Sequence, residues 1–469
     1  MNINEVIMKI YNSLTRRKEE FVPLEEGKVR MYACGITVSG EAHIGHAFQA
    51  IIYDVFRKFL EKKGYKVTYA RNYTDVDDKI IARSRETGIP ADKYAAMMID
   101  KIDAVMKRAD VDEPTLWLKA TENIGNIISF IQGLIDGGHA YAAQNGDVYF
   151  DVDSFPAYGQ LSGRSKEDML DGVRVENDDE KKNPYDFALW KAAKPGEIAW
   201  DSPWGKGRPG WHIECSAMNR AAFGDQIDIH GGGRDLVFPH HENEIAQSEA
   251  LTGKRFAKYW THNGLIKVNG QKMSKSLGNS LLLGDLLDKY SSDALKFALL
   301  SGNYRNDINI TDDLFPSAEA HLVRFYTLIG RAEKAFPEET GKEAEIDKKF
   351  DAAMEDDFNT ALALSDLFGY FKEVARLLEA NDPEARRITN QIRATYALLG
   401  LFKKDPASYL AQYGAKEEDV PAEVRAVADE RFAARREKNW AKSDELREKL
   451  RAMGYAVKDS KEGYSLEKI

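Results

Sequence analysis

Residues 28–80 constrain the fold of this 469-residue chain more than any other stretch. Residues 29–33 and 66–70 each predict a strand, and between them apolar side chains recur every four residues, as in an amphipathic helix: Ala47, Ile51, Val55 and Phe59. We expect Cys34 and Gly35 to end the first strand and residues 72–79 to follow the second. Strand, helix and strand in this order open a parallel α/β sheet, in which ligands bind at the carboxyl ends of the strands.

The composition is that of an ordinary globular protein, with 43% hydrophobic and 30% charged residues. No stretch reaches the roughly 18 apolar residues that a membrane span needs, and residues 1–22 lack the continuous apolar core of a signal peptide. Two cysteines do not make a disulfide framework, which indicates a reducing compartment. We therefore expect a cytoplasmic protein with no membrane contact. The net charge of −10 excludes a basic surface over the whole molecule.

Two motifs are candidates for phosphate binding. The first, His43-Ile44-Gly45-His46, opens the predicted helix, where backbone N–H groups attract anions and the missing Cβ of Gly45 lets a flat ligand approach. The second is the loop of residues 272–279, whose Lys272 and Lys275 can close over a polyphosphate and stabilise charge on it. Taken singly, each motif is equally compatible with an ordinary loop, and neither is a Walker loop.

The two cysteines lie in dense motifs that predict a metal site. Cys34 follows the first strand, Cys215 lies in Trp-His-Ile-Glu-Cys, and residues 239–244 read Pro-His-His-Glu-Asn-Glu. If Pro239 starts a helix, His240 and Glu244 share a face, and His241 and Glu242 point elsewhere. Two thiolates, a histidine and a carboxylate are typical ligands of zinc, and a closed structural zinc has the same number of ligands.

Together the two phosphate motifs resemble the paired signature of class I aminoacyl-tRNA synthetases. The neighbouring stretches narrow the resemblance to cysteinyl-tRNA synthetases, over about residues 8–460. They are the residues 32–37, 72–79, 186–191, 202–216, 228–233 and 238–244.

The resemblance implies activation of L-cysteine by ATP and transfer of the cysteinyl group to the 3′ end of tRNA(Cys). It implies one Zn²⁺ per chain, held by Cys34, Cys215, His240 and Glu244, that binds the substrate thiol, and Mg²⁺ that arrives with ATP. It casts His43, His46, Lys272 and Lys275 as catalytic residues and His43, Gly45, His46 and Lys275 as ATP-binding residues. The implied cysteine pocket consists of Gly35, Thr37, Thr74, Trp211 and His230, with plain core packing as the lesser alternative for Trp211. The family resemblance also favours a monomer.

The expected fold is α/β: a Rossmann-like parallel-sheet catalytic domain with an insertion, then a helical-bundle domain and a small C-terminal module. The catalytic domain is expected at 1–111 and 201–262, with a connective insertion at 112–200. A loop and stem-contact region follows at 263–314, a helical anticodon-side bundle at 315–402, and a linker with an anticodon-binding module at 403–469.

Two other functions stay open at the level of sequence. A cysteine ligase of the mycothiol pathway resembles the same catalytic domain and joins cysteine to an amino sugar. A non-catalytic tRNA-binding paralogue is the second alternative. The long helical tail favours tRNA as the acceptor, and the complete phosphate motifs favour an enzyme.

Overall fold

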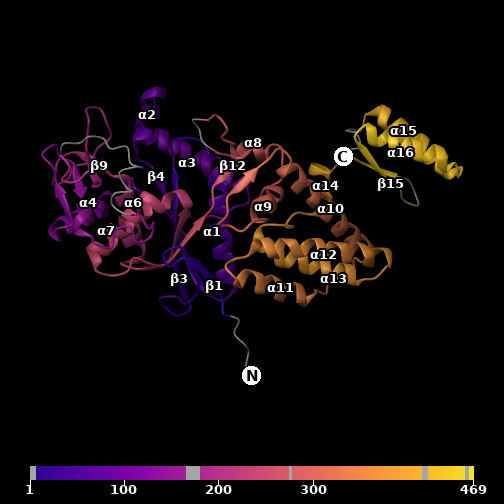
Figure 1. Cartoon of the computed structure of the whole chain (residues 1–469), viewed down its shortest axis with the longest axis horizontal. Coiled ribbons are helices and arrows are strands. Elements are labelled where there is room, and N and C mark those ends of the chain that lie inside the picture. The colour runs from indigo at the N-terminus through magenta and orange to yellow at the C-terminus, as the bar shows by residue number, and fades with distance from the viewer. Residues whose placement is uncertain (1–6, 165–179, 274–276, 415–420, 460–463, 469) are drawn as a thin grey trace, which may run out of the picture. The chain divides into compact units, whose positions relative to one another are not determined.

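A computed structural model describes residues 7–164, 180–273, 277–414, 421–459 and 464–468 of the chain (Figure 1). The chain forms two compact units, Met1–Lys403 and Lys404–Ile469. Among the described residues, no helix combines the length and the apolar character that crossing a membrane requires.

The core of the first unit is a five-stranded parallel sheet, as the sequence predicts. Its strand order is β11-β10-β3-β4-β5. The strands are β3 (Lys28–Thr37), β4 (Lys66–Thr74), β5 (Leu116–Lys119), β10 (Ile227–Gly233) and β11 (Ala257–Asn263). Helix α1 (Ile44–Lys62) connects β3 to β4 and buries the predicted stripe of Ala47, Ile51, Val55 and Phe59. The helices α2 (Asp78–Thr87) and α3 (Ala91–Arg108) connect β4 to β5.

Strand β3 does not end at Cys34 and Gly35, as we expected from the glycine. It continues to Thr37, and its pairing with β4 shifts register between Ala33 and Ile36. Gly35 permits this irregularity, because a Cβ there would lie 1.6 Å from the backbone oxygen of Asn72. Cys34 is therefore held inside a strand at a point where two backbones approach closely.

The insertion forms an antiparallel sheet of order β6-β7-β8-β9 beside α4 (Figure 1). Its elements are α4 (Ile124–Asp136), β6 (Ala140–Ala142), β7 (Val148–Phe150), β8 (Phe187–Ala192) and β9 (Gly207–Pro209). Strand β5 pairs with β4 in the parallel sheet. Strand β9 pairs with β8 in the sheet of the insertion. The domain limits given above stay predictions.

Two helices and a short irregular turn carry the site residues between β9 and β11. They are α6 (Trp211–Phe223), a kinked turn at Val237–His241, and α7 (Glu242–Thr252). The turn contains a cis peptide bond between Phe238 and Pro239. The residues after Pro239 have helical dihedral angles, so His240 lies in the first turn that leads into α7.

The rest of the first unit is a small sheet followed by a helical bundle. A hairpin, β1 (Lys9–Asn12) and β2 (Arg17–Glu20), begins the unit, and the small sheet is β12 (Ile266–Val268), β13 (Gln271–Lys272) and β14 (Ile308–Ile310). The helices are α8 (Leu283–Leu287), α9 (Ser292–Leu300), α10 (Leu314–Ala335), α11 (Ala344–Glu355), α12 (Thr360–Glu379) and α13 (Glu384–Tyr396). The carboxylate of Asp357 joins the bundle to the first strand, accepting hydrogen bonds from Tyr11 N (2.8 Å), Tyr304 Oη (2.9 Å) and Arg305 Nε (3.0 Å).

The second unit contains more structure than the sequence predicts. The region expected to hold a linker and a C-terminal module contains three helices: α14 (Pro406–Tyr413), α15 (Ala422–Arg436) and α16 (Trp440–Ala452). A hairpin of β15 (Tyr455–Asp459) and β16 (Tyr464–Lys468) was not predicted. It packs on the two helices around Val424, Leu446, Leu450 and Tyr455.

Candidate active site

The two cysteines meet in the core of the first unit, although 181 positions separate them in the sequence. Cys34 lies in β3 and Cys215 in α6, and their sulfurs are 3.8 Å apart. Both thiols are free and buried. Two sulfurs bound tetrahedrally to one zinc at about 2.3 Å each would be about 3.8 Å apart. The spacing thus suits a shared metal ion.

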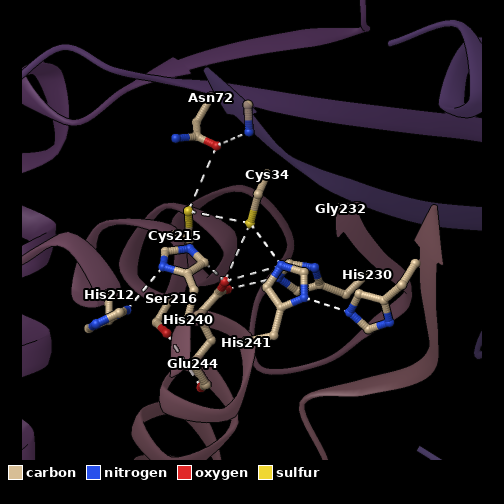
Figure 2. A network of polar contacts seen from close by, with 12 residues as sticks. Cys34, Asn72, His212, Cys215, Ser216, His230, Gly232, His240, His241 and Glu244 are labelled. Carbon is tan, nitrogen blue, oxygen red and sulfur yellow. Dashed lines mark hydrogen bonds and ion pairs between the residues drawn. The ribbon is translucent and has the colours of Figure 1, made fainter. Parts of the chain in front are cut away.

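His240 and Glu244 complete the predicted group. Glu244 Oε1 lies 3.1 Å from His240 Nε2 and 3.4 Å from the Cys34 sulfur (Figure 2). The ligand atoms of Cys34, Cys215, His240 and Glu244 all lie within 4.8 Å of one another, and all four residues are buried. The structure therefore brings together the four residues that the sequence analysis selects.

A second group overlaps the first, which the sequence analysis did not foresee. His230, His241, Cys34 and Glu244 also have ligand atoms within 4.8 Å of one another. His241 Nε2 is 3.3 Å from the Cys34 sulfur, so the expectation that His241 points elsewhere is wrong. His241 and Glu244 are three positions apart, and residues at that spacing are also neighbours on a helix. His230, placed in the cysteine pocket by the resemblance, contacts Glu244 Oε2 at 2.7 Å.

Further side chains orient these groups from outside the cluster. His240 Nδ1 lies 3.0 Å from His212 Nδ1, and His241 Nδ1 lies 2.8 Å from His262 Nε2. In each case one ring nitrogen is engaged away from the cluster and the other faces it, which is the usual arrangement of metal-bound histidines. His262 was missed at the level of sequence, and the structure places it near the carboxyl end of β11.

Burial and mutual contact shift the pKa values of the cluster in opposite directions. Burial raises the pKa of the Cys34 thiol well above its usual value, whereas the hydrogen bond from Cys34 lowers the pKa of Cys215 to about 6. Burial alone would lower the pKa of His240, but contacts with Cys215 and Glu244 outweigh it and raise the pKa to about 10. Burial would raise the pKa of Glu244, but His230 and His240 hold it well below its usual value.

The cluster has the properties of a metal site. It combines two soft sulfur donors, imidazole nitrogens and one carboxylate, all away from solvent. Unpaired buried charges are costly, and a bound cation removes that cost. His230 Nδ1 is in addition buried without a hydrogen-bond partner among the described residues. The chemistry of the donors fits Zn²⁺.

A cavity of about 560 Å³ lies beside the cluster, between the insertion, the start of α2, the start of α6 and the turn that leads into α7. Trp211 and His212 line it, and Trp211 is 40% exposed with its ring 4.4 Å from that of His240. Simple core packing therefore does not explain Trp211.

The remaining residues of the implied cysteine pocket lie at the ends of β3 and β4. Thr37 and Thr74 are paired in register across β3 and β4, and Gly35 N donates to Asn72 Oδ1 at 2.8 Å. Asn72 Oδ1 also lies 3.7 Å from the Cys215 sulfur, which the sequence analysis did not predict.

The two phosphate motifs are also brought together. His43 caps α1, its Nδ1 accepts the N–H of Gly45 at 3.2 Å, and its ring stacks on that of His46. His43 pairs with Leu282, just after the lysine loop, and a Cβ on Gly45 would lie 3.4 Å from Met273. Lys272 is exposed in β13, and Lys275 lies outside the described residues.

Comparisons with known proteins agree with this geometry. The family described as "tRNA synthetases class I (C) catalytic domain" matches residues 20–320, a DALR domain matches 349–403, and a "Cysteinyl-tRNA ligase anticodon binding domain" matches 417–464. The cysteine–tRNA ligase of Syntrophotalea carbinolica is 46% identical, over 97% of this chain and 98% of its own length. That of Stutzerimonas stutzeri is 47% identical over the same shares.

Solved structures show the same fold at low sequence identity. Mycobacterium tuberculosis methionyl-tRNA synthetase in complex with methionyl-adenylate is 14% identical with a TM-score of 0.57, and covers 82% of this chain and 91% of its own. An Agrobacterium radiobacter LeuRS–tRNA–LeuAMS complex is 11% identical with a TM-score of 0.60, and covers 85% and 86%. Taken with the near full-length relatives, these findings mean that the chain belongs to the cysteine–tRNA ligase family of class I aminoacyl-tRNA synthetases.

Proposed function

We propose that this chain attaches L-cysteine to tRNA(Cys) in two steps and selects cysteine through a zinc ion. The observation that carries the proposal is the buried group of Cys34, Cys215, His240 and Glu244 beside an open cavity. Zinc bound there supplies a soft Lewis acid that favours a thiolate over a hydroxyl group. Apolar packing alone separates such similar side chains by only about 1–3 kcal/mol.

In the first step, the carboxylate of cysteine attacks the α-phosphate of ATP, and the bond to pyrophosphate breaks. We assign the start of α1, with His43, Gly45 and His46, to ATP binding, because its backbone N–H groups attract anions. Lys272 and Lys275 stabilise the charge on the departing pyrophosphate, with Mg²⁺ bound to the nucleotide. The pairing of His43 with Leu282 supports this assignment, since it holds the lysine loop close to α1.

In the second step, a hydroxyl of the terminal ribose attacks the carbonyl carbon of the adenylate, and AMP leaves. This requires positioning more than acid–base chemistry. Gly35, Thr37, Thr74, Trp211 and His230 are assigned to the cysteine pocket. The ring of Trp211 lies 4.4 Å from that of His240, which supports its place there. We also propose that the protein acts as a monomer in the cytoplasm.

A test begins with cysteine-dependent exchange of pyrophosphate into ATP. Absence of exchange would reject both enzymatic functions, the tRNA ligase and the cysteine ligase of the mycothiol pathway. A non-catalytic tRNA-binding paralogue would then be the remaining alternative. Charging of tRNA(Cys), compared with acylation of an amino-sugar acceptor, then separates the two enzymes. The match of residues 417–464 to an anticodon-binding domain favours tRNA.

The metal assignment is tested by His240→Ala with His321→Ala as the control. His321 lies on α10 in the helical bundle, away from the cluster. We expect His240→Ala to lower bound zinc, measured by mass spectrometry, and to raise the KM for cysteine. His321→Ala keeps one zinc per chain. An unchanged zinc content in His240→Ala would refute the ligand assignment.

A further inference from the structure

A buried carboxylate next to the metal cluster binds a turn of the insertion. Glu242 lies in the sequence between His240 and Glu244, which both face the cluster, and it is fully buried. Its Oε1 accepts the N–H of Gly159 at 2.9 Å. Its Oε2 accepts those of Leu161 at 3.2 Å and Ser162 at 2.7 Å. One carboxylate thus satisfies three backbone donors of the turn at residues 156–162.

The same turn contacts α7 through its side chains as well. The hydroxyl of Tyr158 donates to Asn243 Oδ1, and Gln160 Nε2 donates to Glu249 Oε2 at 3.3 Å. Leu161 is buried in the apolar cluster that contains Cys34 and Cys215. The turn is therefore fixed to the helix that carries Glu244 and to the apolar surroundings of the thiols.

The turn also forms part of the cavity beside the cluster. Tyr158 and Asn243 line that cavity together with Trp211 and His212. Its volume of about 560 Å³ is within the range of small-ligand sites, roughly 300–1,000 Å³. Aromatic side chains such as those of Tyr158 and Trp211 offer faces on which a nucleobase can stack. The position of this wall depends on the three hydrogen bonds to Glu242.

We propose that Glu242 is a positioning residue for the transfer step, which holds the Tyr158 wall where the 3′ end of the tRNA must reach the adenylate. This inference rests on the proposed function. The contacts of Glu242 are with the turn, and none of those described is with the phosphate motifs at His43 or Lys272. Activation of cysteine is therefore expected to be independent of Glu242, and transfer is expected to depend on it.

Glu242→Gln tests this separation. The amide keeps the shape but presents an NH₂ group to a backbone N–H, so at least one hydrogen bond of the turn is lost. We expect zinc content and cysteine-dependent pyrophosphate exchange within about twofold of wild type. Single-turnover transfer from preformed cysteinyl-adenylate to tRNA(Cys) is expected to fall at least about tenfold, since small displacements of reacting groups are costly.

Glu249→Gln is the matched control. It removes a carboxylate from the same helix that contacts the same turn only through the side chain of Gln160. Its transfer rate should stay within about twofold of wild type, because the backbone bonds to Glu242 remain. Tyr158→Phe removes the hydroxyl bond to Asn243 and should slow transfer in the same direction as Glu242→Gln, by about threefold. It provides the test if Glu242→Gln does not fold.

Three outcomes would overturn the inference: transfer unchanged in Glu242→Gln, exchange reduced in parallel with transfer, or loss of zinc from the variant. If Glu242→Gln does not fold, an unchanged transfer rate in Tyr158→Phe overturns it. Failure of the proposed function gives a different result, because wild-type protein would then show no cysteine-dependent exchange. A defect confined to transfer in Glu242→Gln, with Glu249→Gln unaffected, supports the inference.

Discussion

Replacing Gly45 by alanine should separate activity from stability. Gly45 is the second residue of α1, where alanine is the better helix former by up to about 1 kcal/mol. The added Cβ would, however, lie 3.1 Å from two ring atoms of His43 and 3.4 Å from the Met273 methyl group. Ordinary contact begins near 3.4 Å, so the His43 ring must move by roughly 0.3 Å or more.

The Cβ added at position 45 would also occupy the surface on which we place ATP. We expect the KM for ATP in pyrophosphate exchange to rise about tenfold, equivalent to about 1.4 kcal/mol of binding free energy. The urea midpoint of unfolding is expected to stay equal or to increase. Gly125→Ala is the control, because Gly125 is the second residue of α4 and a Cβ there meets nothing within 4 Å.

The reasoning predicts two different results for two glycines at the same helical position. It would be refuted if Gly45→Ala bound ATP with the wild-type KM. It would also be refuted if both variants lost ATP affinity equally, since a general effect of alanine at a helix start would then explain the result.

Three further predictions concern stability and metal. In Asp357→Asn the side chain keeps its shape, and asparagine tolerates the left-handed backbone at this position (φ 63°). The variant loses the charged hydrogen bond to Arg305, so its free energy of unfolding in urea titration should be lower by about 2 kcal/mol. An unchanged midpoint would contradict this. For Asp307, burial would raise the pKa, but the N–H of Leu265 and the charges of Lys267 and Arg234 outweigh it and hold the pKa below 3.8. The stability from this depressed pKa is present above pH 3.8 and is lost as pH falls through the lower folded-state value. Asp307→Asn should therefore cost about 1 kcal/mol at pH 7, after discounting for solvent screening, and progressively less as the pH falls below 3.8; a cost that does not decrease with falling pH would argue against the ion pairs. Removal of zinc by a chelator should lower the thermal midpoint and abolish cysteine-dependent exchange, and added zinc should restore both; full exchange by metal-free protein would exclude a role of zinc in substrate selection.

The parallel sheet and the pairing of His240 with Glu244 were predictable because both depend on simple periodicity. A helical stripe between two short strands fixes a β-α-β unit, and the spacing of four residues between His240 and Glu244 places both on one face. The two thiols have no such spacing, since 181 positions separate them. Residue chemistry and resemblance were needed to join Cys34 and Cys215 to the group.

The failures have equally local causes. The strand through Cys34 continues past Gly35 because the glycine allows close contact with Asn72, and a glycine in the sequence does not reveal whether a strand ends or bulges. His241 was excluded by a rule that counted only residues four apart, although residues three apart also share a face. The hairpin of β15 and β16 was missed, although Tyr455 and Val457, like Tyr464 and Leu466, alternate along its strands and pack on α15 and α16.

The distance along the chain between the cluster residues has a consequence for biosynthesis. Glu244 follows Cys34 by 210 positions, so more than half of the chain must leave the ribosome before these residues can meet. Strand β10 must also insert beside β3. A metal ion held by all four ligands can therefore bind only after β3, α6 and α7 have come together, and not to the isolated first strands. Metal content in newly made protein would then report that this step of folding has been reached.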